Sequence, residues 1–444
     1  MASKPFKLEA DPPLGPIYFD TRTATYWLQI PSGRFLNLPA SDVKLHLQND
    51  GMLVSETGAN EIKNGDRALI RAQIDRPIDY AGPLAGHTLG AFKTPAGQTI
   101  LVTQEARPMM AVPGAFPALE KFCEELLGSE QSLYFLLWLK FARESLVKKD
   151  FRSRQLLALC GPSSSGKSLA QQFVTELLGG RVAKPYRYMK GETNFNADLC
   201  ECEHWCIEDE AATTDIRTRR AFGQAIKQAC VNSLVSLHAK GRKAIAVNVF
   251  KSITVSLNSE SENLLILPPM DESILDKIML LKCDPISTGK DCTITGNREK
   301  DWKKFRAELP AFAAAIDAMS CPPALRCPRY GVKHFHHPEL FERLCDMSQE
   351  TRLLEFIEQF ICKGDNEPFA FKGNATQLEI ELKKTPAAFA VDRLLHFPNA
   401  CGTYLARLEK RMPERFSSVK NRGKTVWTIK GEKENEQTDS DKPA

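Results

Sequence analysis

The chain has 444 residues, more than one compact core usually holds, so two or three domains are expected. Hydrophobic residues make up 43% of the sequence, an ordinary share for a globular protein. The formal net charge of +4 is too small to indicate a partner, so charge has to be considered segment by segment.

The 13 cysteines are scattered and often stand inside apolar runs, and the first residues lack the apolar segment of a secretory signal. We therefore expect reduced thiols and a cytoplasmic protein. No apolar run approaches the roughly 20 residues that span a bilayer, so no contact with a membrane is expected.

Residues 1–115 are predicted to form a β-rich N-terminal domain. Short apolar or aromatic runs, among them PIYFD, TYWLQI, RFLNL and TILVTQ, alternate with glycine, proline, asparagine and aspartate turn signals. No paired acids and no His-x-His pattern indicate a primase site, and the aromatic side chains are interpreted as core. The sequence assigns no role to this domain.

Residues 116–362 are predicted to hold a helical collar and an α/β core. Apolar positions at helical spacing predict two helices in residues 116–150. Residues 151–285 alternate short β runs with helical stretches, the pattern of a mostly parallel sheet, and residues 300–365 return to helical periodicity. The fold class is therefore α/β.

The strongest motif lies between an apolar strand and a helix. It has the form G-x-x-x-x-G-K-[ST] and consists of Gly161, Pro162, Ser163, Ser164, Ser165, Gly166, Lys167 and Ser168. Such a loop wraps phosphates with backbone N–H groups, and the helix N-terminus adds positive potential. Lys167 is predicted to reach the β- and γ-phosphates of ATP, and the Ser168 hydroxyl to hold Mg²⁺. The alternative is a plain glycine-serine turn.

A second apolar strand ends in three acids, Glu208, Asp209 and Glu210. In P-loop ATPases one carboxylate at such a strand end orients Mg²⁺, and a following glutamate polarises the attacking water. Asp209 is assigned to the metal and Glu210 to the base. Glu208 could replace either, and the alternative is a solvated strand end.

Two clusters of histidine and cysteine raise the question of zinc. The spacing C-x-C-x-H-x-C is not a usual zinc pattern, and the His334, His336 and His337 group has no companion ligands. Both clusters are interpreted as structural, the first with Cys200, Cys202, His204 and Cys206 as packed side chains.

A third feature joins a basic hairpin to an apolar strand that ends in Asn258. Two β-prone arms in residues 233–250 flank the tip of Lys240, Gly241, Arg242 and Lys243. Asn258 is predicted to sense the γ-phosphate or the lytic water. The tip is predicted to follow the backbone of single-stranded DNA through its phosphates; the alternative is a solvated basic turn.

Residues 363–431 are predicted to form a winged helix-turn-helix, and the polar residues 432–444 a disordered tail. Twelve basic against five acidic residues leave +7 between residues 371 and 430. The third helix, with Arg407, Lys410 and Arg411, suits a major groove, and the wing, with Arg422 and Lys424, suits phosphates. The alternatives are a solvated basic face and a docking surface for a protein.

The ordered motifs GPSSSGKS, WCIEDE, LHAKGRK and ITVSLN resemble those of superfamily 3 helicases, above all the helicase part of phage and plasmid primase–helicase proteins. The resemblance covers about residues 120–350. It implies an AAA+-like core in a hexameric ring, with ATP between subunits and single-stranded DNA in the pore. It matches Lys167 and Ser168 to the nucleotide loop, Asp209 and Glu210 to the Mg²⁺ and water site, Lys240 to the hairpin lysine, and Asn258 to the sensor.

The sequence departs from this family at Asp276-Lys277, where an Asp-Arg pair is usual and its arginine reaches a neighbour's phosphate. Lysine lacks the planar fork of arginine, so the trans charge could come from Lys277 or from Arg217, Arg219 or Arg220. The primase half of the family is also missing. Priming is therefore not implied, and a separate primase is a candidate partner.

The sequence thus predicts an ATP-dependent DNA helicase for phage- or plasmid-type replication in a bacterial host cell, with duplex DNA at the winged helix. A second hypothesis is a replication initiator that uses ATP only to assemble on DNA. A third is a P-loop kinase for a small molecule, which would have no use for a winged helix.

Overall fold

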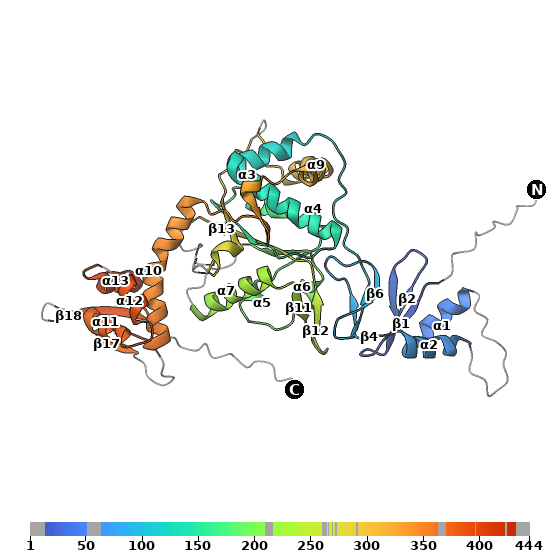
Figure 1. The fold of residues 1–444 in the computed structure, drawn as a ribbon, viewed down its shortest axis with the longest axis horizontal. Coiled ribbons are helices and arrows are strands. Elements are labelled where there is room, and N and C mark those ends of the chain that lie inside the picture. The colour runs from blue at the N-terminus through green and yellow to red at the C-terminus, as the bar shows by residue number, and fades with distance from the viewer. Residues whose placement is uncertain are drawn as a thin grey trace, which may run out of the picture. The chain divides into compact units, whose positions relative to one another are not determined.

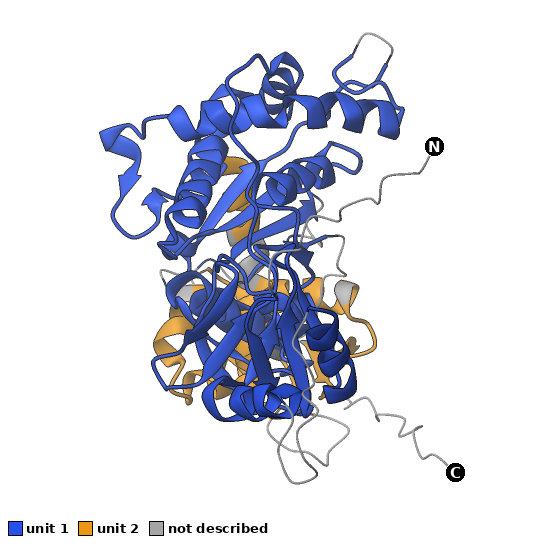
Figure 2. Cartoon of the chain, turned by 90° about the vertical axis from the view of Figure 1, so that its right-hand side faces the viewer, with its two compact units in different colours: residues 1–337 blue, residues 338–444 orange. Residues whose placement is uncertain are grey.

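The computed structural model describes residues 14–50, 64–208, 216–259, 264, 266–268, 270, 273–289, 292–362, 370–395, 397–421 and 424–431. The chain divides into two compact units, residues 1–337 and 338–444 (Figure 2). The second unit begins before the boundary predicted after residue 362. Within the described ranges, no helix combines the length and apolar character that crossing a bilayer requires.

A five-stranded parallel sheet forms the centre of the first unit, in the order β14-β8-β13-β10-β9. The strands are β8 Leu156–Gly161, β9 Val182–Ala183, β10 His204–Ile207, β13 Ser252–Asn258 and β14 Ile278–Lys282. The apolar sequences of β8 and β10 are buried along their whole length, as expected of strands covered on both faces. The predicted mixed α/β class is confirmed.

Helices cover both faces of this sheet (Figure 1). One face carries α3 Pro117–Lys148, α4 Lys167–Leu177 and α9 Arg298–Ala318; the other carries α5 Tyr186–Met189, α6 Ala197–Cys200 and α7 Ile216–Val231. The two helices predicted in residues 116–150 are the two halves of α3. They meet at Gly128, whose φ of 65° is a left-handed conformation that glycine adopts without steric cost.

The N-terminal part of this unit contains two small sheets, β3-β2-β1-β4 and β5-β7-β6. The strands are β1 Ile17–Asp20, β2 Thr25–Gln29, β3 Phe35–Leu38, β4 Pro77–Ile78, β5 Tyr80–Gly82, β6 Gly90–Lys93 and β7 Thr99–Val102. Two helices that the sequence analysis did not predict, α1 Ala40–Asn49 and α2 Asn64–Asp75, pack against the first sheet.

The remaining elements of the first unit are short. The strands β11 Leu234–Leu237 and β12 Ile245–Asn248 form an antiparallel hairpin. A second antiparallel pair consists of β15 Arg326–Cys327 and β16 Gly331–Val332. The two 3-10 turns are η1 Leu275–Lys277 and η2 Pro323–Leu325.

The second unit has four helices and an antiparallel sheet in the order β17-β19-β18 among its described residues. The helices are α10 Pro338–Phe360, α11 Ala375–Lys383, α12 Ala388–Leu394 and α13 Ala400–Arg411; the strands are β17 Phe371–Gly373, β18 Phe416–Asn421 and β19 Lys424–Ile429. One core includes Ile357 of α10, Leu378 of α11, Leu405 of α13 and Trp427 of β19. Helix α10 is therefore part of this unit's core.

Candidate nucleotide and nucleic-acid sites

The predicted phosphate loop joins β8 to α4. A Cβ atom at Gly161 would lie 2.2 Å from the backbone oxygen of Cys283, so only glycine fits where the loop leaves the strand. Gly166 caps α4 with a φ of 101°, again in the left-handed region. The loop consequently opens directly onto the N-terminus of an eleven-residue helix, where backbone N–H groups favour an anion.

The Lys167 side chain lies over this loop and is only 6% exposed. Its Nζ donates to the backbone oxygens of Gly161 at 2.9 Å and Pro162 at 2.5 Å. It also donates to the side-chain oxygen of Asn258 at 3.3 Å. The ammonium group is therefore shared between the loop and the neighbouring strand.

Asn258 is the last residue of β13, and β13 is hydrogen-bonded to β8 with Asn258 opposite Gly161. The parallel register brings the ends of both strands to the same edge of the sheet. Lys167 and Asn258, which stand 91 residues apart in the sequence, thus meet at the carboxyl edge, where open α/β sheets bind ligands.

The acidic strand end reaches the same edge, because β10 is the parallel neighbour of β13. Glu208 follows β10 and accepts a hydrogen bond from Lys184, which follows β9, so that the two form an ion pair. Asp209 and Glu210 lie outside the described residues. Their assignments to the metal and to the base remain predictions.

Ser168, in the first turn of α4, lines a cavity of about 780 Å³. Lys184 and Glu208 line the same cavity, and Arg298 at the start of α9 contributes to it. No motif singled out Lys184 or Arg298. Among the described residues, no cluster of three or more histidine, cysteine or acidic side chains could hold a metal ion.

A buried network of polar side chains connects α4 to the strands β10 and β13 next to the carboxyl edge of the central sheet. The Gln171 amide of α4 donates to the backbone oxygen of Ile207 and to the Thr254 hydroxyl. The His204 ring is hydrogen-bonded through Nδ1 to Thr175 and through Nε2 to Thr254. Burial lowers the pKa of His204 to about 3, so its ring is neutral near pH 7. This network ties α4 to β10 and β13.

The cysteines near His204 are packed rather than arranged around an ion. Burial raises the pKa of both Cys200 and Cys206 to about 12, so both keep their protons near pH 7. In the other cluster, the His336 ring faces the backbone oxygens of Leu275 and Ile278.

The hairpin β11–β12 stands on the core through the buried side chains of Leu237, Ile245 and Val247. Buried Asn196 accepts from the N–H of His238, which places the start of the tip. Lys240 and Lys243 are exposed at the tip. Arg242 differs from them, because its guanidinium is hydrogen-bonded to Asp20 in the N-terminal part.

The trans-charge candidates lie in different settings. Lys277 precedes β14, at the amino end of the sheet, and is paired with Asp276 at 2.6 Å. Arg219 is 4% exposed and donates to the backbone oxygen of Leu267. The side chains of Arg217 and Arg220 are outside those described.

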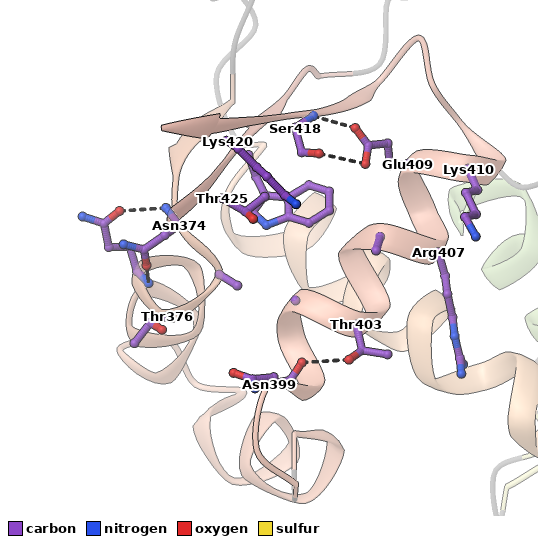
Figure 3. Close-up of a pocket in the computed structure, with 15 residues that line it drawn as sticks. Asn374, Thr376, Asn399, Thr403, Arg407, Glu409, Lys410, Ser418, Lys420 and Thr425 are labelled. Carbon is purple, nitrogen blue, oxygen red and sulfur yellow. Dashed lines mark hydrogen bonds between the residues drawn. The ribbon is translucent and has the colours of Figure 1, made fainter. Parts of the chain in front are cut away.

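The second unit has a groove of about 1220 Å³ between α11, α13 and the strands β18 and β19 (Figure 3). Its lining includes Arg407 and Lys410 from α13 and Lys420 from β18. Glu409, also in the lining, accepts hydrogen bonds from the Ser418 N–H at 2.6 Å and the Ser418 hydroxyl at 2.9 Å, which connects α13 to β18 (Figure 3).

Of the other basic residues predicted to bind DNA in this unit, Arg422 and the side chains of Arg411 and Lys424 lie outside the described set. Arg407 is exposed and paired with Glu350 of α10 at 3.0 Å. That ion pair holds the side chain near α10 in the structure.

No protein-family model matches the chain, and no curated protein matches it in sequence. A structure of the apo NrS-1 C-terminal region aligns with a TM-score of 0.51 and 12% identity, over 94% of this chain and 96% of that one. An A-form apo structure of that region gives a TM-score of 0.50 at 11% identity and the same coverage. A structure titled as an active helicase, SCCmec type IV Cch, reaches a TM-score of 0.31, too low to indicate a common fold. The comparisons therefore show a fold shared with the NrS-1 C-terminal region along most of the chain.

Proposed function

We propose that the protein is an ATP-dependent DNA helicase of the superfamily 3 type, acting as a hexameric ring on single-stranded DNA in phage- or plasmid-type replication. The observation that carries the proposal is the meeting of Lys167, Asn258 and the end of β10 at one edge of a parallel sheet. Between β10 and β13 the chain inserts a hairpin with two exposed lysines at its tip. The first feature is suited to a nucleotide and the second to nucleic acid.

The residues at the sheet edge fit Mg²⁺-ATP. The loop combines a helix N-terminus, a buried ammonium and an exposed hydroxyl at Ser168, which together suit a phosphate and its cation. Bound Mg²⁺-ATP would supply the phosphoanhydride bond whose hydrolysis drives movement. Lys167 would turn from the loop carbonyls to the phosphates, and Asn258 would hydrogen-bond the γ-phosphate or the water.

The acids can be given separate roles. Glu208 is already neutralised by Lys184, so we assign the metal to Asp209 and the general base to Glu210. Arg219 is buried and bound within its own subunit, so Lys277, Arg217 and Arg220 remain the candidates for the charge supplied to a neighbour.

For nucleic acid we propose two surfaces. Lys240 and Lys243 hold the phosphates of a single strand in the pore, while Arg242 anchors the hairpin. The second unit is a winged helix that binds duplex DNA. The helices α11, α12 and α13 followed by the strands β18 and β19 support this, as does the basic groove beside α13.

The same features would serve a replication initiator that uses ATP only to assemble. The two functions differ in strand separation, which only the helicase performs. A kinase for a small molecule would leave the hairpin and the second unit without a role.

The nucleotide site is tested by ATP hydrolysis. Lys167→Ala should reduce turnover by at least a hundredfold, with and without single-stranded DNA, because the ammonium that binds the phosphates is lost. Lys148→Ala is the matched control, since Lys148 is an exposed lysine of α3 paired with Glu144, and it should hydrolyse ATP like the wild type. Turnover by Lys167→Ala within a few-fold of the wild type would contradict the assignment.

A further inference from the structure

The tip of the β11–β12 hairpin is bound to the N-terminal part of the chain (Figure 1). Arg242 at the tip donates through Nη2 to the Asp20 carboxylate at 2.6 Å. Through Nη1 it donates to the backbone oxygen of Asp79 at 2.7 Å. Asp79 directly follows β4, and Asp20 at the end of β1 pairs with Ile78, the last residue of β4, so both acids lie at the same end of these strands. We call this set of contacts the tip clamp.

The tip clamp is buried, which distinguishes it from an ordinary surface ion pair. The Asp20 side chain is 1% exposed and that of Arg242 is 16% exposed. Asp20 also accepts hydrogen bonds from the N–H groups of Arg22 and Thr23. Burial alone would raise the pKa of Asp20, but the bonds from Arg242 and these N–H groups outweigh burial and lower it. The Asp20 carboxylate therefore stays charged. It binds both the β1–β2 turn, through Arg22 and Thr23, and the hairpin tip, through Arg242.

The turn between β1 and β2 is thereby brought against the hairpin tip. A Cβ atom built on Gly241 would lie 3.5 Å from Nη2 of Arg22. Arg22, Lys240 and Lys243 are all exposed. Within the described part of the chain, no carboxylate forms an ion pair with any of these three side chains. The cation of Arg22 in the β1–β2 turn therefore lies beside the hairpin tip that carries Lys240 and Lys243, and none of the three is paired with a carboxylate among the described residues.

We propose that the β1–β2 turn is a second contact for the backbone of single-stranded DNA, with Arg22 binding a phosphate beside those held by Lys240 and Lys243. The proposal rests on the proposed helicase function and adds a role for the N-terminal part. The tip clamp makes the two turns a single body, so a movement of the hairpin carries Arg22 with it. Arginine suits this position because its planar fork can bind a phosphate through two N–H groups.

The experiment is a salt titration of the full chain binding a fluorescent oligo(dT), followed by anisotropy. Loss of one phosphate contact should weaken binding. It should also reduce the slope of the logarithm of the binding constant against the logarithm of the salt concentration by about 0.7 on a single strand. We expect this of Arg22→Ala. Arg34→Ala is the matched control, because Arg34 is an exposed arginine in the next turn of the same sheet, between β2 and β3, and should bind like the wild type.

The outcomes separate this inference from the proposed function. If Lys240→Ala weakens binding and Arg22→Ala does not, the second contact is wrong and the hairpin contact stands. If neither variant changes binding, both proposals are contradicted. If Arg22→Ala and Arg34→Ala lose equal amounts of binding, the loss comes from the lower net charge and not from a specific contact. That result would also overturn the inference.

The tip clamp has its own test. Asp20→Asn removes the charge but keeps an oxygen that can accept from the N–H groups of Arg22 and Thr23. In the Asp20→Asn protein, adding Arg22→Ala should cost less binding than it does in the wild type, because Arg22 is no longer held beside the tip. Equal costs in both backgrounds would show that the clamp does not position Arg22.

Discussion

Single polar side chains under the sheet edge hold the candidate nucleotide site in shape. Gln171 and His204 connect α4 to β10 and β13 through four hydrogen bonds, three of them buried and the bond to Thr175 partly buried. Hydrogen bonds between buried polar groups favour one arrangement, and the loss of a partner leaves a costly unsatisfied group. The position of α4, and with it Lys167, therefore depends on residues that do not touch the loop.

His204 makes this dependence measurable through pH. The folded protein keeps the ring neutral down to about pH 3, whereas an unfolded histidine takes up a proton near pH 6.5. Between these values the unfolded state binds more protons. The free energy of unfolding should therefore fall as the pH is lowered through 6.5, with a limiting slope of about 1.4 kcal/mol per pH unit from this residue.

The measurement is chemical denaturation of the wild type and His204→Gln at pH 7.5, 6.5 and 5.5. The variant should be less stable at pH 7.5, because hydrogen bonds are lost. Its stability should also change less with pH, while other titrating groups contribute equally to both proteins. Parallel pH profiles would mean that His204 is not held neutral.

The sequence could predict part of the site at this scale. Lys167 and Ser168 follow from a local motif, and Asn258 from its place at a strand end. Asp20 and Arg242 stand 222 residues apart, and no local pattern links them. The role of Lys184 could not be predicted either, because its partner Glu208 follows a different strand and no local pattern links the two.

Among the elements, the hairpin β11–β12 makes its tip contacts with Asp20 and Asp79 of the N-terminal part, whereas the loop is hydrogen-bonded to the end of β13 through Lys167 and Asn258. Lys240→Ala should therefore keep basal ATP hydrolysis and lose both stimulation by single-stranded DNA and unwinding. Lys148→Ala serves again as the control. A collapse of basal hydrolysis in Lys240→Ala would place the residue in the nucleotide site and contradict its role as a DNA contact.

The second unit allows a separate test, in which the fragment must start at Pro338. Leu353, Leu354 and Ile357 of α10 share one core with α13 and the sheet, so a fragment starting after residue 362 would lose part of it. For residues 338–431, Arg422→Ala with Lys424→Ala should lower the salt slope on duplex DNA by about two units, if each binds one phosphate. All sequences should be affected alike.

The control is Lys383→Ala with Lys384→Ala, at the end of α11, where both lysines are paired with acids. This variant should keep the wild-type slope. An unchanged slope in the wing variant would instead favour a docking surface for a protein such as a primase.

Element prediction failed where the pattern was ambiguous. Val43, Leu45 and Leu47 alternate as in a strand, yet they lie in α1, where Leu45 is 63% exposed. Tertiary packing of Val43 and Leu47 decided the outcome there. β17 has three residues and exists through its pairing with β19, which local sequence does not reveal.

For the whole molecule, the α/β class and the parallel sheet followed from the alternation of apolar strands and helices. The NrS-1 C-terminal region shares this fold at only 11–12% sequence identity, so most positions can change without a change of fold. The proposed ring, the charge supplied to a neighbour and the movement of the hairpins would each involve several subunits.

The most direct test of the central claim is strand separation on a forked DNA duplex with Mg²⁺ and ATP, measured for the wild type beside Lys167→Ala. The proposed function predicts that the wild type releases the labelled strand only when ATP is hydrolysed, and that Lys167→Ala releases none. Binding of the fork by the wild type together with ATP hydrolysis, but without strand release on forks of either polarity, would contradict the helicase and favour the initiator.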